Sequence, residues 1–385
     1  MSFLAWIDFD QSDRERTHRI MDLFAEEEAR DELGVSAVRD GLSDLMFPGT
    51  STIQTRLRYM LFVPWIYRQA HRHPGSGLAR AEVARSLEIR LIEALIAGGE
   101  KTGVIGSVAK GALKRFPSDV YWAGLGVLGI RRFHGSRSAY FDLQPGAEEN
   151  IGLWSAGLPD EQLGFLDATT FRLTRDETGF LIDRLHQVAP QSLFRELVGS
   201  GDSVRCTSIW THPMRATWTE DNQILVQHAE FLACMVLGAS LLYNLMLSEL
   251  MSERAGEGSA WQDRSDDYRS RIKDWQRELE QLPLQDWRLE DLWRRVGATA
   301  HRVTPLTRRF IVEWLETTRQ TRSSICDDPD ARRIIERRER TLKGAKSRFA
   351  NTAALSRWSG SSGTQVIGFR WDLVSSHLKD LTNAE

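Results

Sequence analysis

Hydrophobic positions along the chain follow the period of an α-helix over most of its length. Apolar residues recur every three or four positions, which places them on one face of a helix. This spacing predicts helices over residues 12–28, 35–46, 78–97, 118–128, 174–188, 221–254, 261–282, 288–297, 304–320, 328–350 and 371–381. Short strands are expected at 2–9 and 364–369. The predicted fold class is therefore mainly α, a multi-helix protein with a few short strands.

Capping residues mark the ends of several predicted helices. Thr174 and Glu177 match a capping box, in which each side chain accepts a hydrogen bond from the other residue's backbone N–H. A Pro-Gly turn precedes the hydroxyl residues at 50–52, so we expect a helix to begin there with one of them as its N-cap. Pro64 should kink or end that helix, because proline lacks a backbone N–H.

Composition divides the chain into three parts. Residues 142–173 contain several glycines and prolines and lack periodicity, which is typical of a connecting region. We expect an N-terminal helical domain over 1–145, an irregular mixed connecting region over 146–220 and a C-terminal helical domain over 221–385. The length of 385 residues suits two or three domains.

The N-terminal part has the element order of a winged helix-turn-helix. Two predicted helices, 78–97 and 118–128, precede a basic segment at 130–141 that is expected to form a hairpin. In that motif the second helix enters the major groove of DNA and the hairpin binds phosphate. The candidate phosphate contacts are Arg131, Arg132 and Arg137. The helix at 118–128 carries no Arg, Lys, Asn or Gln to read bases, so burial in the core is the alternative.

One uncharged run, residues 231–248, is just long enough to span a bilayer. Ser240, Tyr243 and Asn244 interrupt its apolar character, and the periodic pattern continues on both sides. We interpret it as the middle of one long buried helix and expect no membrane contact. The N-terminus lacks the features of a secretory signal, and three scattered cysteines fit a reducing cytoplasm.

Charge is distributed unevenly, although the formal net charge is only −3. Residues 1–47 carry 12 acidic and 5 basic side chains, whereas residues 52–140 carry 14 basic and 5 acidic ones. Residues 331–350 add 8 basic and 2 acidic side chains. Such local positive segments can bind a phosphate backbone even in a nearly neutral protein. The alternative is that they are solvated or contact the protein's own acidic parts, above all the N-terminal segment.

In the C-terminal basic segment, helical spacing brings several cations to one side. These residues are Arg333, Arg337, Arg340, Lys343 and Lys346. Ile334 and Ile335 lie off this stripe and are expected to pack inward. The segment is thus predicted to be an amphipathic helix whose cationic side can lie along a phosphate backbone.

The segment FPGTSTIQTRLR, residues 47–58, is a candidate anion site. A helix N-terminus offers free backbone N–H groups and a partial positive charge. The candidate contacts are Gly49, Thr50, Ser51 and Thr52, followed by Arg56 and Arg58. The segment is not a Walker loop, which requires GxxxxGK[ST]. A structural helix start is the favoured interpretation of its hydroxyl residues.

Arg295 and His301 have the RxxxxxH spacing of small helical ribonucleases of the HEPN type. The resemblance implies that the histidine acts in cleavage at a 2′-hydroxyl and that the arginine stabilises phosphate. Val296 departs from the polar residue that usually follows the arginine, and a chance match in an arginine-rich chain is the alternative. No cysteine or histidine spacing indicates a metal site, and no cofactor is expected.

Sequence blocks near both ends carry a second resemblance. SFLAWIDFD and FPGTSTIQTRLRYMLFVPWIY, with SRFANTAALSRWSGSSG and FRWDLVSSHLKDL, resemble an uncharacterised bacterial family. That family is described as a domain of unknown function covering most of the chain. The resemblance implies a gene near phage-defence or restriction clusters, beside helicases and phospholipase-D-like nucleases. It implies no catalytic residues.

Two functional hypotheses follow from the sequence. The first is a non-enzymatic nucleic-acid-binding or adaptor component of a bacterial phage-defence system, with DNA or RNA and other defence proteins as partners. The second is a helical ribonuclease that uses Arg295 and His301, and an enzyme is the less favoured of the two. A purely structural scaffold is a third reading, because tryptophan-rich helical cores need no ligand.

Overall fold

A computed structural model describes residues 31–383, apart from 108–112, 114, 145–151, 201–205, 257 and 322–323. Within these residues the chain is predominantly helical, and its one β-type pairing is an isolated bridge between Arg131 and Trp154. The mainly α fold class is therefore confirmed, whereas the strand expected at 364–369 is not formed. The strand expected at 2–9 and the helix expected at 12–28 lie outside the described residues.

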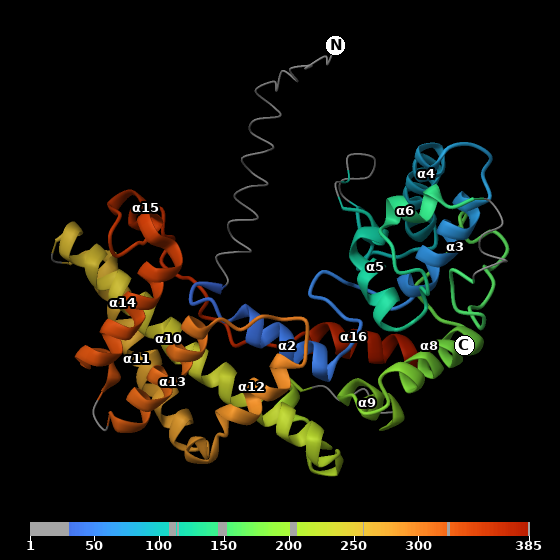
Figure 1. Cartoon of the computed structure of the whole chain (residues 1–385). Coiled ribbons are helices and arrows are strands. Elements are labelled where there is room, and N and C mark those ends of the chain that lie inside the picture. The colour runs from blue at the N-terminus through green and yellow to red at the C-terminus, as the bar shows by residue number, and fades with distance from the viewer. Residues whose placement is uncertain are drawn as a thin grey trace. The chain divides into compact units, whose positions relative to one another are not determined.

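The chain folds into two compact units, and each is assembled from segments that are far apart in the sequence (Figure 1). Unit 1 contains the described parts of Met1–Gly41 and His228–Ile367. Unit 2 contains the described parts of Leu42–Gln227 and Gly368–Glu385. Two boundaries fall inside helices, α2 (Ser36–Met46) and α10 (Glu220–Ala255).

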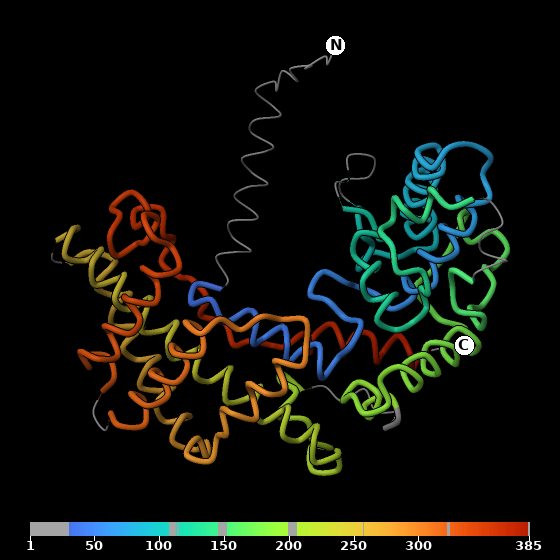
Figure 2. Tube along the Cα trace, in the orientation of Figure 1, coloured from blue at the N-terminus to red at the C-terminus, as the bar shows by residue number. Residues whose placement is uncertain are grey.

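Unit 2 consists of short and medium helices joined by loops. They are α3 (Tyr59–His71), α4 (Gly77–Ala97), α5 (Pro117–Val127), α6 (Arg137–Asp142), α8 (Arg175–Val188), α9 (Leu193–Ser200) and α16 (Trp371–Thr382), with 3₁₀ turns η3 (Ile209–Thr211) and η4 (Arg215–Thr217). α4 lies against α3 and α6, and α5 lies against α3 (Figure 2). The buried rings of Tyr121 and Phe171 each lie 5.2 Å from the ring of Tyr59, so aromatic packing holds these elements together.

Unit 1 is built around the part of α10 that begins at His228. Its other helices are α11 (Ala260–Glu280), α12 (Leu289–Gly297), α13 (Pro305–Gln320), α14 (Pro329–Lys343) and α15 (Thr352–Ser356), with 3₁₀ turns η5 (Leu284–Asp286), η6 (Ile325–Asp327) and η7 (Gly344–Lys346). Trp275 of α11 and Trp314 of α13 donate their indole N–H groups to the backbone carbonyls of Cys234 and Met235 in α10. These two tryptophan rings stack, with centroids 6.3 Å apart.

α10 is long and apolar enough to cross a membrane by length and composition. In its most apolar window, however, 83% of the residues are buried inside the protein. Gly238 explains how closely α11 approaches α10, because a Cβ at this position would lie 2.1 Å from a ring carbon of Trp275. This burial supports the interpretation of the uncharged run as a core helix.

The helix expected to begin at residues 50–52 begins instead at Tyr59, and that prediction is wrong. The intervening chain is held as a loop, because the backbone N–H groups of Thr55 and Arg56 both donate to the Tyr121 hydroxyl, at 2.9 and 3.0 Å. Nor does Pro64 end the helix, since α3 continues to His71.

The hairpin expected at 130–141 is also wrong, and the winged-helix-like arrangement is therefore not supported. Ser136 caps α6 by accepting a hydrogen bond from the Ala139 N–H, so the second half of the segment is helical. The first half pairs with a distant segment: the backbone N–H groups of Arg132 and Phe133 donate to the carbonyl of Leu153. The proposed recognition helix, α5, buries Val120, Tyr121 and Leu125 in the core.

Candidate anion-binding site

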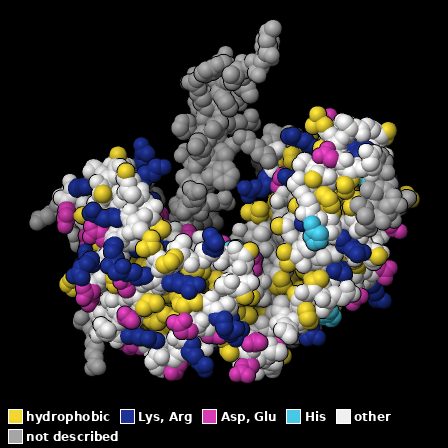
Figure 3. Space-filling view, in the orientation of Figure 1, with side chains coloured by type: hydrophobic (Ala, Val, Ile, Leu, Met, Phe, Trp, Pro, Cys, Tyr) yellow, Lys and Arg dark blue, Asp and Glu magenta, His cyan; other side chains and the backbone are white. Residues whose placement is uncertain are grey.

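Most of the cations predicted to contact phosphate pair with carboxylates of the protein itself. The pairs are Arg56 with Asp380, Arg58 with Glu177, Arg137 with Asp119, Arg333 with Asp330, Arg337 with Glu313, Arg340 with Glu336 and Lys343 with Glu32. On the face shown in Figure 3, basic and acidic side chains are interspersed around α13 and α14. The positive balance of these sequence segments is thus largely compensated within the fold.

Arg58 is a buried structural residue. Its side chain and that of Glu177 are each 3% exposed, and the two are joined by a 2.7 Å ion pair. Glu177 also accepts a hydrogen bond from the Thr174 N–H, which completes the predicted capping box of α8. Arg58 therefore links the start of α3 to the start of α8.

Arg56 is held on the other side of the same loop. Its Nε donates to Asp380 of α16 at 2.9 Å, and its guanidinium carbon lies 4.6 Å from the ring centroid of Phe171. Asp380 also accepts the backbone N–H of Leu57 at 2.9 Å. The carboxylate thus binds both the arginine and the loop, and the two predicted cations at 56 and 58 serve the packing of unit 2.

The hydroxyl residues at 50–52 lie in a loop, well before the helix begins. Thr50 is buried, and both its N–H and its hydroxyl donate to the carbonyl of Phe47. The carbonyl of Thr50 accepts a hydrogen bond from Arg370 at 2.8 Å. Gly49 has a φ of +79°, and a Cβ there would lie 2.8 Å from Leu128. The helix N-terminus that motivated the anion prediction is therefore absent from this loop.

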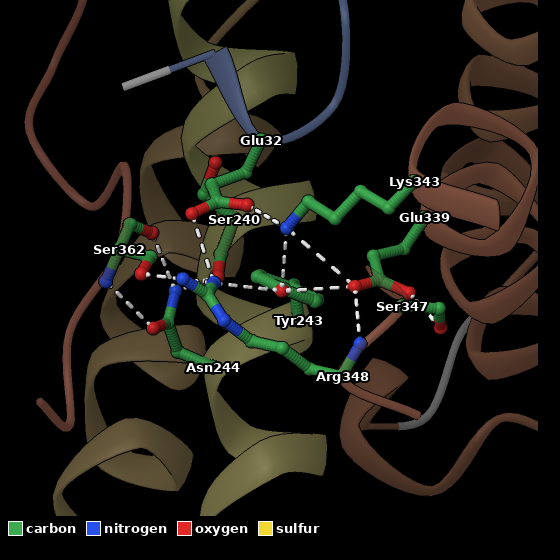
Figure 4. Close-up of polar contacts among 9 residues, drawn as sticks. All are labelled: Glu32, Ser240, Tyr243, Asn244, Glu339, Lys343, Ser347, Arg348 and Ser362. Carbon is green, nitrogen blue, oxygen red and sulfur yellow. Dashed lines mark hydrogen bonds and ion pairs between the residues drawn. The ribbon is translucent and has the colours of Figure 1, made fainter. Parts of the chain in front are cut away.

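Lys343 belongs to a buried polar network in unit 1 (Figure 4). Lys343 and Arg348 both bind the carboxylate of Glu32, and Arg348 reaches it at 2.8 Å. The Tyr243 hydroxyl of α10 contacts both cations, at 3.1 Å from Lys343 and 2.9 Å from Arg348. A second buried carboxylate, Glu339, accepts the backbone N–H of Arg348 and the hydroxyl of Ser347.

This network is complete in itself. Two cations face two carboxylates that are each almost fully buried. Asn244 extends the network by exchanging hydrogen bonds with the backbone of Ser362, at 2.7 and 2.8 Å. Buried charges of this kind are satisfied by each other, so we interpret the cluster as a clamp between α10, α14 and residues 31–35. Glu32 is the acidic internal partner that the charge distribution suggested for one basic segment.

The predicted cationic helix is shorter than expected. α14 ends at Lys343, and Gly344 follows with a φ of +53°. Lys346 therefore lies in η7, where its side chain is exposed. The stripe of five cations predicted along one helix does not form as a continuous surface.

Arg131 and Arg132 lie instead in an open hollow of unit 2, with a volume of about 950 Å³. Its walls come from the end of α5 and the loop after it, from residues 155–157, and from α8. Four arginines line it, together with His134 and two aspartates, Asp176 and Asp183. The arginines are Arg131, Arg132, Arg175 and Arg184. The four arginines outnumber the two aspartates, so the formal charge of the lining is positive even with a neutral histidine.

Two of these arginines are fixed by neutral acceptors. Arg131 lies over the ring of Trp122, with its guanidinium carbon 4.6 Å from the centroid, and donates to the carbonyls of Trp122 and Phe133. Arg184 donates to the carbonyl of Leu128 at 3.0 Å. Backbone carbonyls orient a guanidinium without cancelling its charge, so both remain sources of positive potential.

Gly129 makes this arrangement of Arg184 sterically feasible. Its φ of +62° is a left-handed conformation that L side chains rarely adopt. A Cβ at this position would lie 2.3 Å from a guanidinium nitrogen of Arg184. The glycine after α5 thus provides both the turn and the space for the arginine.

The remaining two arginines are exposed and available to a ligand. Arg132 lies in the loop after α5, and Arg175 is the first residue of α8. Over the described part of the chain, neither side chain forms an ion pair or a hydrogen bond. A hollow with two fixed and two open guanidiniums can bind an anion through bidentate hydrogen bonds.

The sequence predicted only half of this site. Arg131 and Arg132 were predicted contacts, whereas Arg175 and Arg184 were not. Both lie in the predicted helix over 174–188, but their spacing along the chain places them on different sides of an ideal helix, so no local pattern marks them as parts of one site. That these residues face the loop after α5 depends on tertiary contacts that no local pattern contains.

Arg295 and His301, the predicted ribonuclease pair, lie at the end of α12 and in the loop after it. Arg295 donates to Asp291 at 2.6 Å, and His228 contacts the same carboxylate at 3.0 Å. Burial alone would raise the pKa of Asp291, but hydrogen bonds from His228, Arg295 and Arg294 hold it below its usual range. Arg295 is thus engaged in a local ion-pair cluster.

The geometry defines a predominantly helical protein whose unit 2 carries an arginine-lined hollow. Comparison with family models then places the chain: it belongs to a family of unknown function, DUF6361, whose model matches residues 1–385. Neither the curated proteins nor the solved structures give a significant match to the chain. Among the described residues, no group of three or more His, Cys, Asp or Glu side chains is placed to hold a metal ion.

Proposed function

We propose that this chain is a non-enzymatic binding module that contacts the phosphate groups of nucleic acid through the arginine-lined hollow of unit 2. The observation that carries the proposal is the contrast between two sets of arginines. Most predicted cations pair with carboxylates, whereas Arg132 and Arg175 are exposed. Beside them, the guanidiniums of Arg131 and Arg184 donate, among the described residues, only to neutral groups, which are backbone carbonyls and one side-chain amide. Positive charge that the fold leaves uncompensated in a hollow favours an anionic ligand.

A phosphate backbone suits this hollow better than a buried small anion. The hollow is open, and its arginines are spread over a loop and a helix. Contacts with phosphate provide affinity without sequence information. We therefore expect weak sequence preference. The setting proposed for this activity is the bacterial defence system implied by the family resemblance, with other defence proteins as further partners.

Binding of short, labelled single-stranded DNA, RNA and duplex DNA tests the proposal. We expect Arg132→Ala together with Arg175→Ala to weaken binding at least about tenfold, because each phosphate contact contributes to the electrostatic affinity. Arg333→Ala together with Arg340→Ala is the matched control, since these exposed arginines pair with neighbouring carboxylates. Absence of binding to all three probes at low salt, or equal losses in the two double variants, would contradict the proposal.

A further inference from the structure

A second concave site lies in unit 2 between α4, α5 and α6, and it shares no lining residue with the arginine hollow. Its volume is about 510 Å³, which is in the range of small-molecule sites. The aromatic rings of Tyr67, Phe116 and Phe141 form part of its wall. Two residues of α4, Arg85 and Glu88, are the polar groups on which the inference depends.

Glu88 is a buried carboxyl group that no described cation contacts directly, although Arg137 donates to the Ser118 hydroxyl beside it. It is 3% exposed, and its two oxygens accept the N–H and the hydroxyl of Ser118 at 2.7 and 3.1 Å. Over the described residues no cation forms an ion pair with it. Arg137, which also lines the cavity, pairs with Asp119 instead. Burial raises the pKa of Glu88 to about 7, although the Ser118 hydrogen bonds and the charge of Arg137 act in the opposite direction.

Arg85 provides the opposite charge on the same helix. It lies three residues before Glu88, so both side chains are on one face of α4. Arg85 is exposed, and its guanidinium carbon lies 5.0 Å from the ring centroid of Phe116. No carboxylate of the described chain pairs with it. The cavity therefore contains a buried carboxyl group, Glu88, and a more exposed cation, Arg85, and neither forms an ion pair with a described residue.

We propose that this cavity binds a small zwitterion, whose ammonium group pairs with Glu88 and whose carboxylate pairs with Arg85. The ammonium would form the direct ion pair that the buried carboxyl lacks among the described residues. The aromatic rings of the wall enclose an apolar side chain. An α-amino acid with an aromatic side chain is the simplest ligand that meets all three requirements.

The proposal predicts a dependence on pH. The groups that face Glu88 from its surroundings are Tyr59 and Tyr67 of α3, Asp119 of α5 and Arg137 of α6. Arg137 is the one cation among them, and it is already paired with Asp119. Since only ionised Glu88 pairs with an ammonium, affinity should fall about tenfold between pH 8 and pH 6.

Calorimetric titration of the full chain with three related probes tests the proposal. L-Phenylalanine carries both charges, phenethylamine lacks the carboxylate, and 3-phenylpropionate lacks the ammonium. We expect phenylalanine to bind at millimolar or lower concentration and each truncated probe to bind at least about tenfold more weakly. Glu88→Gln and Arg85→Ala should each weaken phenylalanine binding to a similar extent.

Two features keep the test decisive. The amide introduced by Glu88→Gln retains an oxygen that can accept the Ser118 N–H, so this variant is expected to fold. Arg85 is exposed, so Arg85→Ala provides a second test that does not disturb the core. Arg90→Ala, on the same helix and outside the cavity, is the control and should bind phenylalanine as the wild type does. No heat with any probe, or equal binding of phenylalanine and phenethylamine, would overturn the proposal.

Discussion

Arginine serves two purposes in this chain, and only the surroundings of each residue distinguish them. Arg58 and Arg132 both belong to basic stretches of the sequence. In the structure Arg58 is buried against Glu177, whereas Arg132 is exposed in a hollow. The sequence predicted both as phosphate contacts. A charge pattern shows how many cations a segment carries, but it does not show which carboxylates lie beside them in the folded protein.

Arg58→Met should be strongly destabilising, because it leaves the buried Glu177 carboxylate without a cationic partner. We expect a loss of about 3–5 kcal/mol in the free energy of unfolding. Arg333→Met is the matched comparison, since both members of the Arg333–Asp330 pair are largely exposed, and it should change stability by less than about 0.5 kcal/mol. Urea unfolding followed by circular dichroism measures both, and equal effects would contradict the structural role of Arg58.

His377 of α16 gives unit 2 a sensitivity to acid. It is fully buried, and neither ring nitrogen has a hydrogen-bond partner among the described residues. Burial together with the charge of Arg56 lowers its pKa to about 3. The unfolded chain binds a proton near pH 6.5 and the folded chain does not, so stability falls as pH decreases below about 6.5. Between pH 7 and pH 5, this histidine should lower the free energy of unfolding by about 2 kcal/mol.

His377→Leu should remove that part of the pH dependence. The measurement is the difference in free energy of unfolding between pH 7 and pH 5, compared with that of the wild type. His73→Leu, at an exposed histidine in the turn after α3, serves as the control. If the wild type and the His377 variant lose the same stability over this interval, the histidine is not buried in its neutral form.

At the scale of helices, sequence patterns were most reliable where local signals and burial agree. The capping box of α8 formed as predicted, and the predicted helix over 78–97 matches α4 closely. Two predictions failed where tertiary hydrogen bonds prevailed. The Tyr121 hydroxyl holds Thr55 and Arg56 in a loop, and Leu153 binds the segment that was expected to form a hairpin. Both partners are distant in the sequence, so no local pattern contains them.

The approach of α11 to α10 depends on a single glycine. Gly238→Ala should destabilise the protein by about 1–3 kcal/mol, because the new Cβ would overlap the ring of Trp275. Gly179→Ala in α8 is the matched control, because its Cβ meets no described atom within 4 Å and alanine is the better helix former. We expect that control to be neutral or up to about 1 kcal/mol more stable. Thermal unfolding curves compare the two, and a neutral Gly238 variant would mean that the helices lie further apart.

At the scale of the whole molecule, the two units could not be predicted from composition. Each joins two segments that are far apart in the sequence. Residues near Glu32 fold with α10 and α14, and α16 folds with α3 and the loop before it. Breaks in composition along the chain mark loops, not the segments that pack together. The role of each cationic segment likewise depends on its carboxylate partners, which only the tertiary structure identifies.

We propose that the arginines of the hollow in unit 2 bind phosphate. The salt dependence of nucleic-acid binding tests this proposal most directly. Affinity for a single strand should fall steeply with salt concentration in the wild type. In the Arg132→Ala, Arg175→Ala variant, the slope of log K against log salt should decrease by about 1.4, or roughly 0.7 for each phosphate that the variant no longer neutralises. A slope unchanged by these two substitutions, but reduced by Arg333→Ala with Arg340→Ala, would show that the binding surface lies on α14 instead.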